Sequence, residues 1–251
     1  MEIQESNMKK QVEESRDELE RRRRSRDRRR KQKKKEKRKR LLYIGTEILA
    51  LTVILAGILW IMSLIFSKNY VDLKKITMPE WVISDFLDPN PYSRPTTEMK
   101  RVNEIVVHYV ANPGTTAKQN MNYFNSLQDQ TGVKKISASS HFIIGLEGEI
   151  LQGIPIYEMA YSTSKEKNGN TVSIECCHPD ETGKFNEATY DSLVKLTAWL
   201  CKNLRLTEKN VIRHYDATGK DCPRYFVAHE DEWKKFLSDV KTARKQTDEG
   251  E

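Results

Sequence analysis

The feature that most constrains this chain is an uninterrupted apolar stretch near its N-terminus. Residues 48–66 form a run of 19 positions without a charged side chain, in which Leu and Ile dominate. A helix of this length rises roughly 30 Å, which matches the hydrocarbon core of a bilayer. A cleaved signal peptide is the alternative, but both the preceding segment and the run are too long for one, and no small-residue cleavage pattern follows. The run therefore predicts a signal anchor, with a transmembrane helix over 41–66.

Basic residues precede this run. Residues 1–40 contain 19 Lys and Arg against 9 Asp and Glu, whereas the rest of the chain carries a net charge of −3. Because Lys and Arg collect on the cytoplasmic side of membrane helices, we predict a basic cytoplasmic tail over 1–40 and an extracytoplasmic location for the residues after 66. Glu18 and Arg22, and likewise Glu20 and Arg24, stand at helical spacing, which would support a solvated helix; otherwise we expect the tail to be disordered. A block such as Arg28 to Lys31 would suit anionic lipid or nucleic acid, but the remainder gives no electrostatic reason to expect nucleic-acid binding.

The part after the apolar run divides into three segments. Prolines at 79, 89 and 91 predict a stalk over 67–100, with a short helix around 81–87 that docks on the domain. A folded domain over 101–242 and a C-terminal tail over 243–251 follow. Apolar patterns predict strands at 104–110, 137–145, 149–153, 171–177 and 211–214. Helices are predicted at 116–130, at 186–204 and around Trp233 to Val240. The expected fold class is α/β, a mixed sheet flanked by helices.

Candidate metal ligands stand at the ends of two predicted strands. His108 ends one strand, and His214 and Cys222 are eight positions apart across a loop that contains Gly219. Two imidazoles and a thiolate leave one tetrahedral position open, which is typical of catalytic zinc. Spacing alone leaves open that these are ordinary core or surface residues. Glu175 lies within an apolar strand, where an unpaired carboxylate costs free energy; a salt bridge to Lys or Arg is the alternative to a catalytic role.

Five stretches, in the same order along the chain, resemble the type-2 N-acetylmuramoyl-L-alanine amidase family: 105–109, 139–145, 149–155, 173–175 and 214–223. Segments 90–95 and 177–180 further resemble a Clostridium-like subgroup. The resemblance implies that zinc is held by His108, His214 and Cys222. It also implies that Glu175 is the general base and that Lys220 stabilises an oxyanion.

The same resemblance implies a function: zinc-dependent hydrolysis of the amide between N-acetylmuramic acid and L-alanine in peptidoglycan. A non-catalytic peptidoglycan-binding module is the alternative, because some relatives keep the fold and lose zinc. The presence of Cys222, Glu175 and Lys220 favours the enzyme.

Several further residues carry expectations. Asn112 and Tyr161 are candidate substrate-binding residues. Two positions depart from the family pattern, because Ser140 replaces a common Tyr and Tyr161 a common His. We expect His141 to be structural and Asp216 to orient the His214 loop. Cys176 and Cys201 either pair outside the membrane or remain buried thiols.

Overall fold

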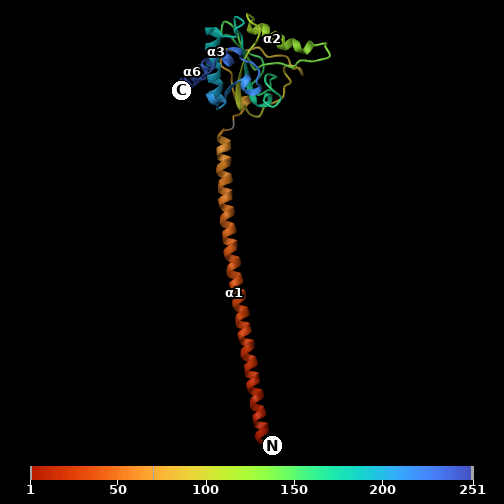
Figure 1. Ribbon diagram of the computed structural model, residues 1–251, viewed down its shortest axis with the longest axis vertical. Helices are drawn as coiled ribbons and strands as arrows, with labels where there is room; N and C mark the ends of the chain where they lie inside the picture. Colours follow the sequence, from red (N-terminus) through yellow and green to blue (C-terminus); the bar gives the residue numbers. More distant parts are fainter. Residues whose placement is uncertain (1, 70, 250–251) are drawn as a thin grey trace. The chain divides into compact units, whose positions relative to one another are not determined.

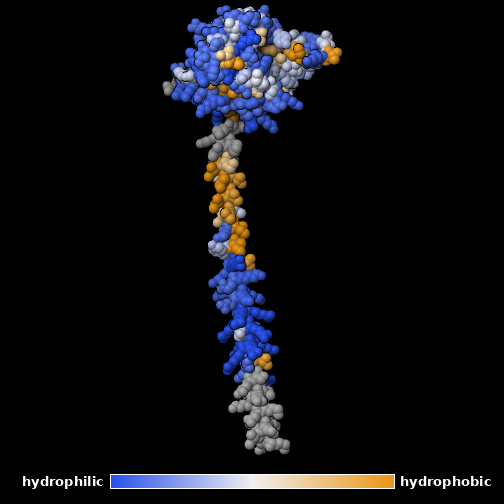
Figure 2. Space-filling model, in the orientation of Figure 1, coloured by the Kyte–Doolittle hydropathy of each residue, from blue (hydrophilic) through white to orange (hydrophobic). Residues whose placement is uncertain are grey.

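The computed structural model describes residues 2–69 and 71–249, with side chains at 16–62 and 71–246. The chain forms two compact units that divide between residues 68 and 69. The first is a single helix, α1 (Glu2–Asn69) (Figure 1). Its described part includes a stretch long and apolar enough to cross a membrane, visible in Figure 2 as a hydrophobic band that follows a hydrophilic segment.

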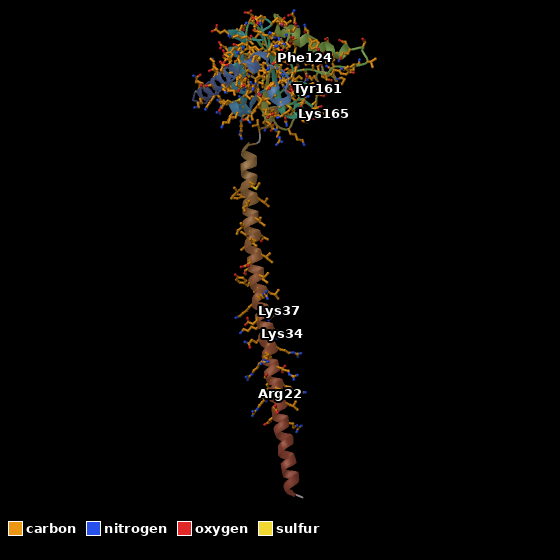
Figure 3. All side chains as sticks on the ribbon, viewed as in Figure 1. Arg22, Lys34, Lys37, Phe124, Tyr161 and Lys165 are labelled. Atoms are coloured by element: carbon orange, nitrogen blue, oxygen red, sulfur yellow. The ribbon has the colours of Figure 1, made fainter. Side chains whose placement is uncertain are left out.

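The structure differs from the predicted disordered tail over 1–40, because α1 includes these residues from Glu2 onward. Lys, Arg and Glu favour helix intrinsically, and Glu18 and Glu20 accept hydrogen bonds from Arg22 and Arg24, one turn later, at 2.7 and 2.8 Å. The side chains of Arg22, Lys34 and Lys37 project outward from α1 in Figure 3. These are the two pairs whose spacing allowed a solvated helix, and the structure extends that helix over the part of the tail that was expected to be disordered.

The second unit is built on a six-stranded mixed sheet. Its strands are β1 (Val82–Ser84), β2 (Glu104–Tyr109), β3 (Phe142–Ile144), β4 (Ile150–Gln152), β5 (Thr171–Cys176) and β6 (Val211–Arg213), in the spatial order β1-β4-β3-β5-β2-β6. Only β3 and β4 pair antiparallel. The predicted α/β class with a mixed sheet is confirmed, although β3 is shorter than the predicted strand at 137–145.

Helices cover both faces of the sheet. On one face lies α2 (Ala117–Ser126), which continues into η2 (Leu127–Asp129) and packs Met121 and Phe124 against Ile143 and Leu151. On the other face lie α3 (Glu187–Asn203) and α6 (Glu230–Glu249), with α5 (Arg224–Ala228) beside them. Their larger core takes Phe142, Ile144 and Ile150, which alternate along β3 and β4 with Ile143 and Leu151 of the core under α2. The sheet is therefore the middle layer of three.

The predicted stalk over 67–100 is wrong for its second half. Residues 82–84 form β1, the edge strand beside β4, in place of the predicted short helix. Backbone N–H groups of Asp85 and Leu87 continue this pairing by donating to Gln152 and Gly153 at 3.0 and 2.9 Å. η1 (Leu73–Lys75) also packs on the core through buried Leu73. The domain thus begins well before residue 101.

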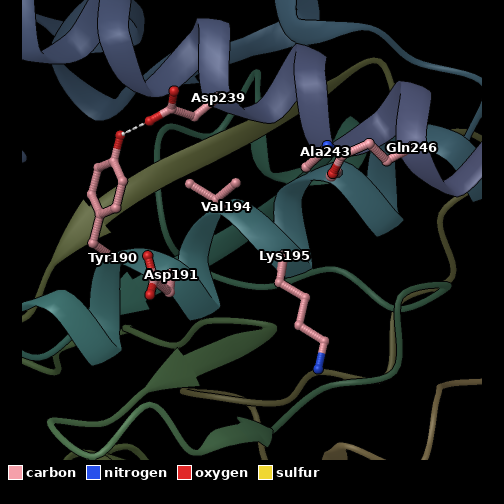
Figure 4. Close-up of a pocket in the computed structure, with 8 residues that line it drawn as sticks. Tyr190, Asp191, Val194, Lys195, Asp239, Ala243 and Gln246 are labelled. Atoms are coloured by element: carbon pink, nitrogen blue, oxygen red, sulfur yellow. Dashed lines mark hydrogen bonds between the residues drawn. The ribbon is translucent and has the colours of Figure 1, made fainter.

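The predicted C-terminal tail over 243–251 also differs from the structure. Helix α6 runs without a break to Glu249, and Ala243 packs partly against the core; residues 250–251 lie outside the described part. A groove of about 510 Å³ lies between α3 and α6, with Val194, Ala198 and Ala243 among its lining residues (Figure 4). It is on the face of the sheet that these helices cover.

The four cysteines are free and buried. Cys176 and Cys201 both lie in the larger core, at 0% exposure. The alternative of buried thiols is the one observed.

Candidate active site

Three parallel strands bring the candidate residues to one edge of the sheet. β5, β2 and β6 are neighbours and run in the same direction, so their carboxyl ends lie side by side. His108, near the end of β2, is the register partner of Glu175 on β5. Their neighbours Val107, Ile174 and Cys176 enter the core under α3 and α6. Because side chains alternate along a strand, His108 and Glu175 point to the opposite face.

The structure places His108, His214 and Cys222 together. Their ligand atoms all lie within 4.8 Å of one another. The Cys222 sulfur is 3.8 Å from His108 Nδ1, and the ring centroids of His108 and His214 are 4.6 Å apart. The exposed fractions are 1%, 6% and 2%. Two imidazoles and one cysteine sulfur thus meet in a buried spot.

Local structure fixes the loop that carries two of these donors. His214 is the first residue of α4 (His214–Thr218), directly after β6. Gly219 ends α4 at φ 78°, in the left-handed region that favours glycine. Cys222 then returns to the start of the helix, where its carbonyl accepts from Tyr215 N–H at 2.9 Å. A short helix and a glycine turn therefore bring residues 214 and 222 back together.

Buried polar atoms at this point lack partners. His108 Nε2, His214 Nδ1 and Glu175 Oε2 have no hydrogen bond among the described residues. Such atoms are rare in folded proteins and call for a ligand or water. The remaining polar groups are oriented by backbone: the Cys222 sulfur accepts a hydrogen bond from the backbone of Tyr109, and the His214 ring bonds to the backbone of Thr163. Backbone contacts of this kind fix the orientation of metal ligands.

Burial governs the electrostatics of the site. It lowers the pKa of His108 well below 6.5 and that of His214 to about 4, so both rings are neutral, the form that binds metal. Burial raises the pKa of the Cys222 thiol to about 12. It also raises the pKa of Glu175 to about 8, against the opposing charge of Lys220.

Glu175, the predicted base, has few polar partners in the structure. Glu175 Oε1 is 4.0 Å from His108 Nδ1, and its side chain is 16% exposed. No Lys or Arg forms an ion pair with it among the described residues, so the alternative of a structural salt bridge is wrong there. Lys220 is exposed, and its charge acts on Glu175, His108 and His214.

The two candidate substrate-binding residues lie on flanking loops. Asn112 is exposed after β2, and its carbonyl accepts from the Thr115 hydroxyl at 2.7 Å. Tyr161 is half-buried, and its backbone pairs with Ser139. Tyr161 lies two positions from Thr163, which contacts His214.

Three other predicted residues have structural contacts. His141 is fully buried, with Nδ1 3.0 Å from the Ser173 hydroxyl and Nε2 2.8 Å from the Glu158 carbonyl oxygen, so it is structural as predicted. Ser140 is also buried and bonds to Ser173. Asp216 accepts from the Arg213 backbone at 2.8 Å and therefore orients the His214 helix.

Sequence reasoning missed the supporting residues. Thr163 and Tyr109 act through their backbones, which leave no signal in side-chain type. Arg213 did leave one, because a charged residue inside an apolar strand end next to His214 needs buried partners.

Comparison with known proteins defines the class. The family model of N-acetylmuramoyl-L-alanine amidases (Amidase_2) matches residues 98–225, about half of the chain. The chain belongs to this family.

Relatives of known sequence support the same class. The chain is 31% identical over 170 residues to the N-acetylmuramoyl-L-alanine amidase CwlL of Bacillus licheniformis, a match that covers 63% of this chain and 46% of CwlL. It is 33% identical over 157 residues to a probable N-acetylmuramoyl-L-alanine amidase of the same species, covering 58% of this chain and 43% of the relative. The chain therefore spans less than half the length of these relatives.

Solved structures share the fold. PlyL superposes with a TM-score of 0.55 at 22% identity, over 64% of this chain and 98% of PlyL. The catalytic domain of XlyA superposes with a TM-score of 0.53 at 26% identity, over 62% of this chain and 98% of that domain.

Proposed function

We propose that this protein is a zinc-dependent amidase that cleaves the amide between N-acetylmuramic acid and L-alanine in peptidoglycan. One observation carries the proposal: His108, His214 and Cys222 meet in a buried cluster within the amidase fold, beside the carboxylate of Glu175. Two further arguments support it, namely the family and the unpartnered Nδ1 of His214. The resemblance to a Clostridium-like subgroup stays a prediction.

The donor set fits zinc. In tetrahedral geometry, a nitrogen and a sulfur bound to one zinc ion lie roughly 3.5 Å apart, close to the 3.8 Å between His108 Nδ1 and the Cys222 sulfur. Two imidazoles and a thiolate favour zinc over harder cations such as magnesium or calcium. His108, His214 and Cys222 would hold the ion and leave a position for substrate and water. When bound, zinc supplies Lewis acidity toward the amide carbonyl and the attacking water.

The remaining chemistry belongs to Glu175 and Lys220. The Glu175 carboxylate takes a proton from the attacking water and passes it to the departing nitrogen. The Lys220 ammonium stabilises the negative charge that develops on the carbonyl oxygen. The products are a lactyl carboxylate on the sugar and a free amine on L-alanine. Asn112 and Tyr161 contact the substrate from the flanking loops.

The alternative function is a non-catalytic peptidoglycan-binding module. Such a module has no need of a complete donor set with an adjacent carboxylate. The cluster of His108, His214 and Cys222 beside Glu175 therefore favours catalysis.

The proposal includes a location. Helix α1 crosses the membrane once, with the basic residues before 41 in the cytoplasm and the amidase domain outside. Peptidoglycan lies on that outer side, so the location and the substrate agree.

The experiment measures zinc content and the release of new amino groups from purified peptidoglycan. Glu175→Gln should keep its zinc and still bind muropeptide, while turnover falls by roughly two to four orders of magnitude, the usual contribution of a positioned base. Lys220→Ala should also retain zinc and lose turnover. Matched controls are Glu104→Gln and Lys209→Ala, which lie at the amino ends of β2 and β6, away from the carboxyl edge. Zinc-loaded wild-type protein that binds muropeptide and releases no amine would establish the binding module instead.

A further inference from the structure

Arg213 places a buried positive charge at the carboxyl edge of the sheet, where the zinc site is proposed. Its side chain is 10% exposed, and it stands at the end of β6, immediately before His214. A guanidinium cannot lose its proton in a protein, so burial obliges it to find acceptors for its donors. Where those acceptors lie shows what the residue holds in place.

The acceptors come from three separate helices. Asp216 of α4 accepts from Nη2 at 2.8 Å and from Nε at 3.1 Å. The Phe226 carbonyl of α5 and the Glu230 carboxylate at the start of α6 accept from Nη1 at 3.0 and 2.6 Å. The guanidinium also lies over the ring of Trp233, at 5.4 Å from its centroid. Arg213 therefore joins the helix that begins with His214 to the helices that follow Cys222.

These contacts enclose the ligand loop. Cys222 lies between the two anchored positions, Asp216 and Phe226, and His214 lies between Arg213 itself and Asp216. Within the loop, backbone bonds run from Tyr215 N–H to the Cys222 carbonyl and from Cys222 N–H to the Lys220 carbonyl, at 2.9 and 2.7 Å. Backbone bonds close the turn itself. An ion pair between Asp221 and Arg224 at 3.5 Å also ties the loop to α5, but among the described residues it is the Arg213 side chain that has acceptors on α4, α5 and α6 together.

We propose that Arg213 is a positioning residue that sets the separation of His214 and Cys222 before the metal arrives. The inference rests on the proposed zinc function. Only the planar guanidinium presents five donors in a fixed fork, which is what three acceptors on three helices require. A lysine keeps the charge but cannot reach all three in one geometry.

A purely stabilising role is the competing explanation. Buried ion pairs are often no better for stability than apolar residues of similar size, which leaves geometry as the reason for this one. The chain offers a matched control in Arg94, whose side chain is 15% exposed and binds both oxygens of Glu158 at 2.8 and 3.0 Å. Its Nη1 also donates to a backbone carbonyl, that of Leu87, at 2.8 Å. None of these partners belongs to the ligand loop.

The test uses the full chain in detergent micelles, stripped of metal. Zinc affinity is measured by competition with a chelating indicator, and ligand geometry by the visible spectrum of the Co²⁺ form. Arg213→Lys should bind zinc 10- to 100-fold more weakly, the usual effect of removing a residue that orients metal ligands, with an altered Co²⁺ spectrum. Arg94→Lys should keep wild-type affinity and spectrum despite the loss of a comparable buried pair.

Wild-type zinc affinity in Arg213→Lys, or an equal loss in Arg94→Lys, would overturn the positioning role. If Arg213→Lys fails to fold, Glu230→Gln decides the question, because it weakens one contact on a side chain that is 54% exposed. That variant should bind zinc several-fold more weakly, and unchanged affinity would overturn the proposal. Failure of the wild-type chain to bind zinc would instead overturn the proposed function.

Discussion

Replacing Arg94 by methionine tests whether residues 71–100 belong to the folded domain. Arg94 lies in the segment predicted as a stalk, yet it binds Glu158 through two hydrogen bonds. The Glu158 side chain is only 8% exposed. The substitution would leave this carboxylate buried and unpaired, which costs about 3–5 kcal/mol. Loss of the donor to the Leu87 carbonyl adds about 1 kcal/mol.

The assay is urea unfolding of a fragment of residues 70–251, followed by tryptophan fluorescence. Arg94→Met should lower the free energy of unfolding by about 5 kcal/mol, the sum of the two contributions. Lys118→Met is the control, since its ion pair with Asp85 is 60% and 29% exposed and should be worth less than about 1 kcal/mol. A loss below about 1 kcal/mol in Arg94→Met would refute the reasoning and restore the stalk.

Three further predictions follow from the site and the helix. Cys222→Ser should lose zinc, because a hydroxyl is a poor zinc ligand. A measured content near one zinc per chain in this variant would show that Cys222 is not a ligand. In the metal-free protein, burial raises the pKa of Glu175 from 4.5 to about 8, so the folded state holds a proton that the unfolded chain has already lost. Wild-type stability should therefore decline relative to Glu175→Gln as pH rises from 5 to 8, by up to about 3 kcal/mol at pH 7; parallel pH profiles of the two proteins would contradict this. Protease added to protoplasts should remove the residues after 66 and spare those before 41, and protection of the domain would reverse the proposed topology.

Periodic segments were the readable part of the fold. β2 and β5 are short β-branched runs, and α3 carries an apolar stripe behind an Asn186 cap, whose side chain accepts from Thr189 N–H. Such elements bury one face or one stripe, so their pattern survives in the sequence. In β1 only Val82 is buried and the next two residues are exposed, so no alternation marks it as a strand; its strand conformation comes from pairing with β4.

The site was readable only in part. The residue types at 108, 214 and 222 suggest a metal, but their convergence rests on the order of strands that are distant along the chain. That order is a long-range property, and only the family resemblance supplied it. The partners of Arg213 lie on three helices, two of which, α4 and α5, are too short to predict from periodicity.

The proposed metal site depends on the register between β2 and β5, because His108 on β2 is paired with Glu175 on β5. A slip of one residue between β2 and β5 would turn one of the two side chains toward the core under α3 and α6. His108 and Cys222 are also 114 positions apart, so a nascent chain lacks a complete donor set until almost the whole domain has been synthesised. Metal capture would thus mark the end of sheet assembly, and the colour of bound Co²⁺ would time that event during refolding, when long-range parallel pairing is the slow step.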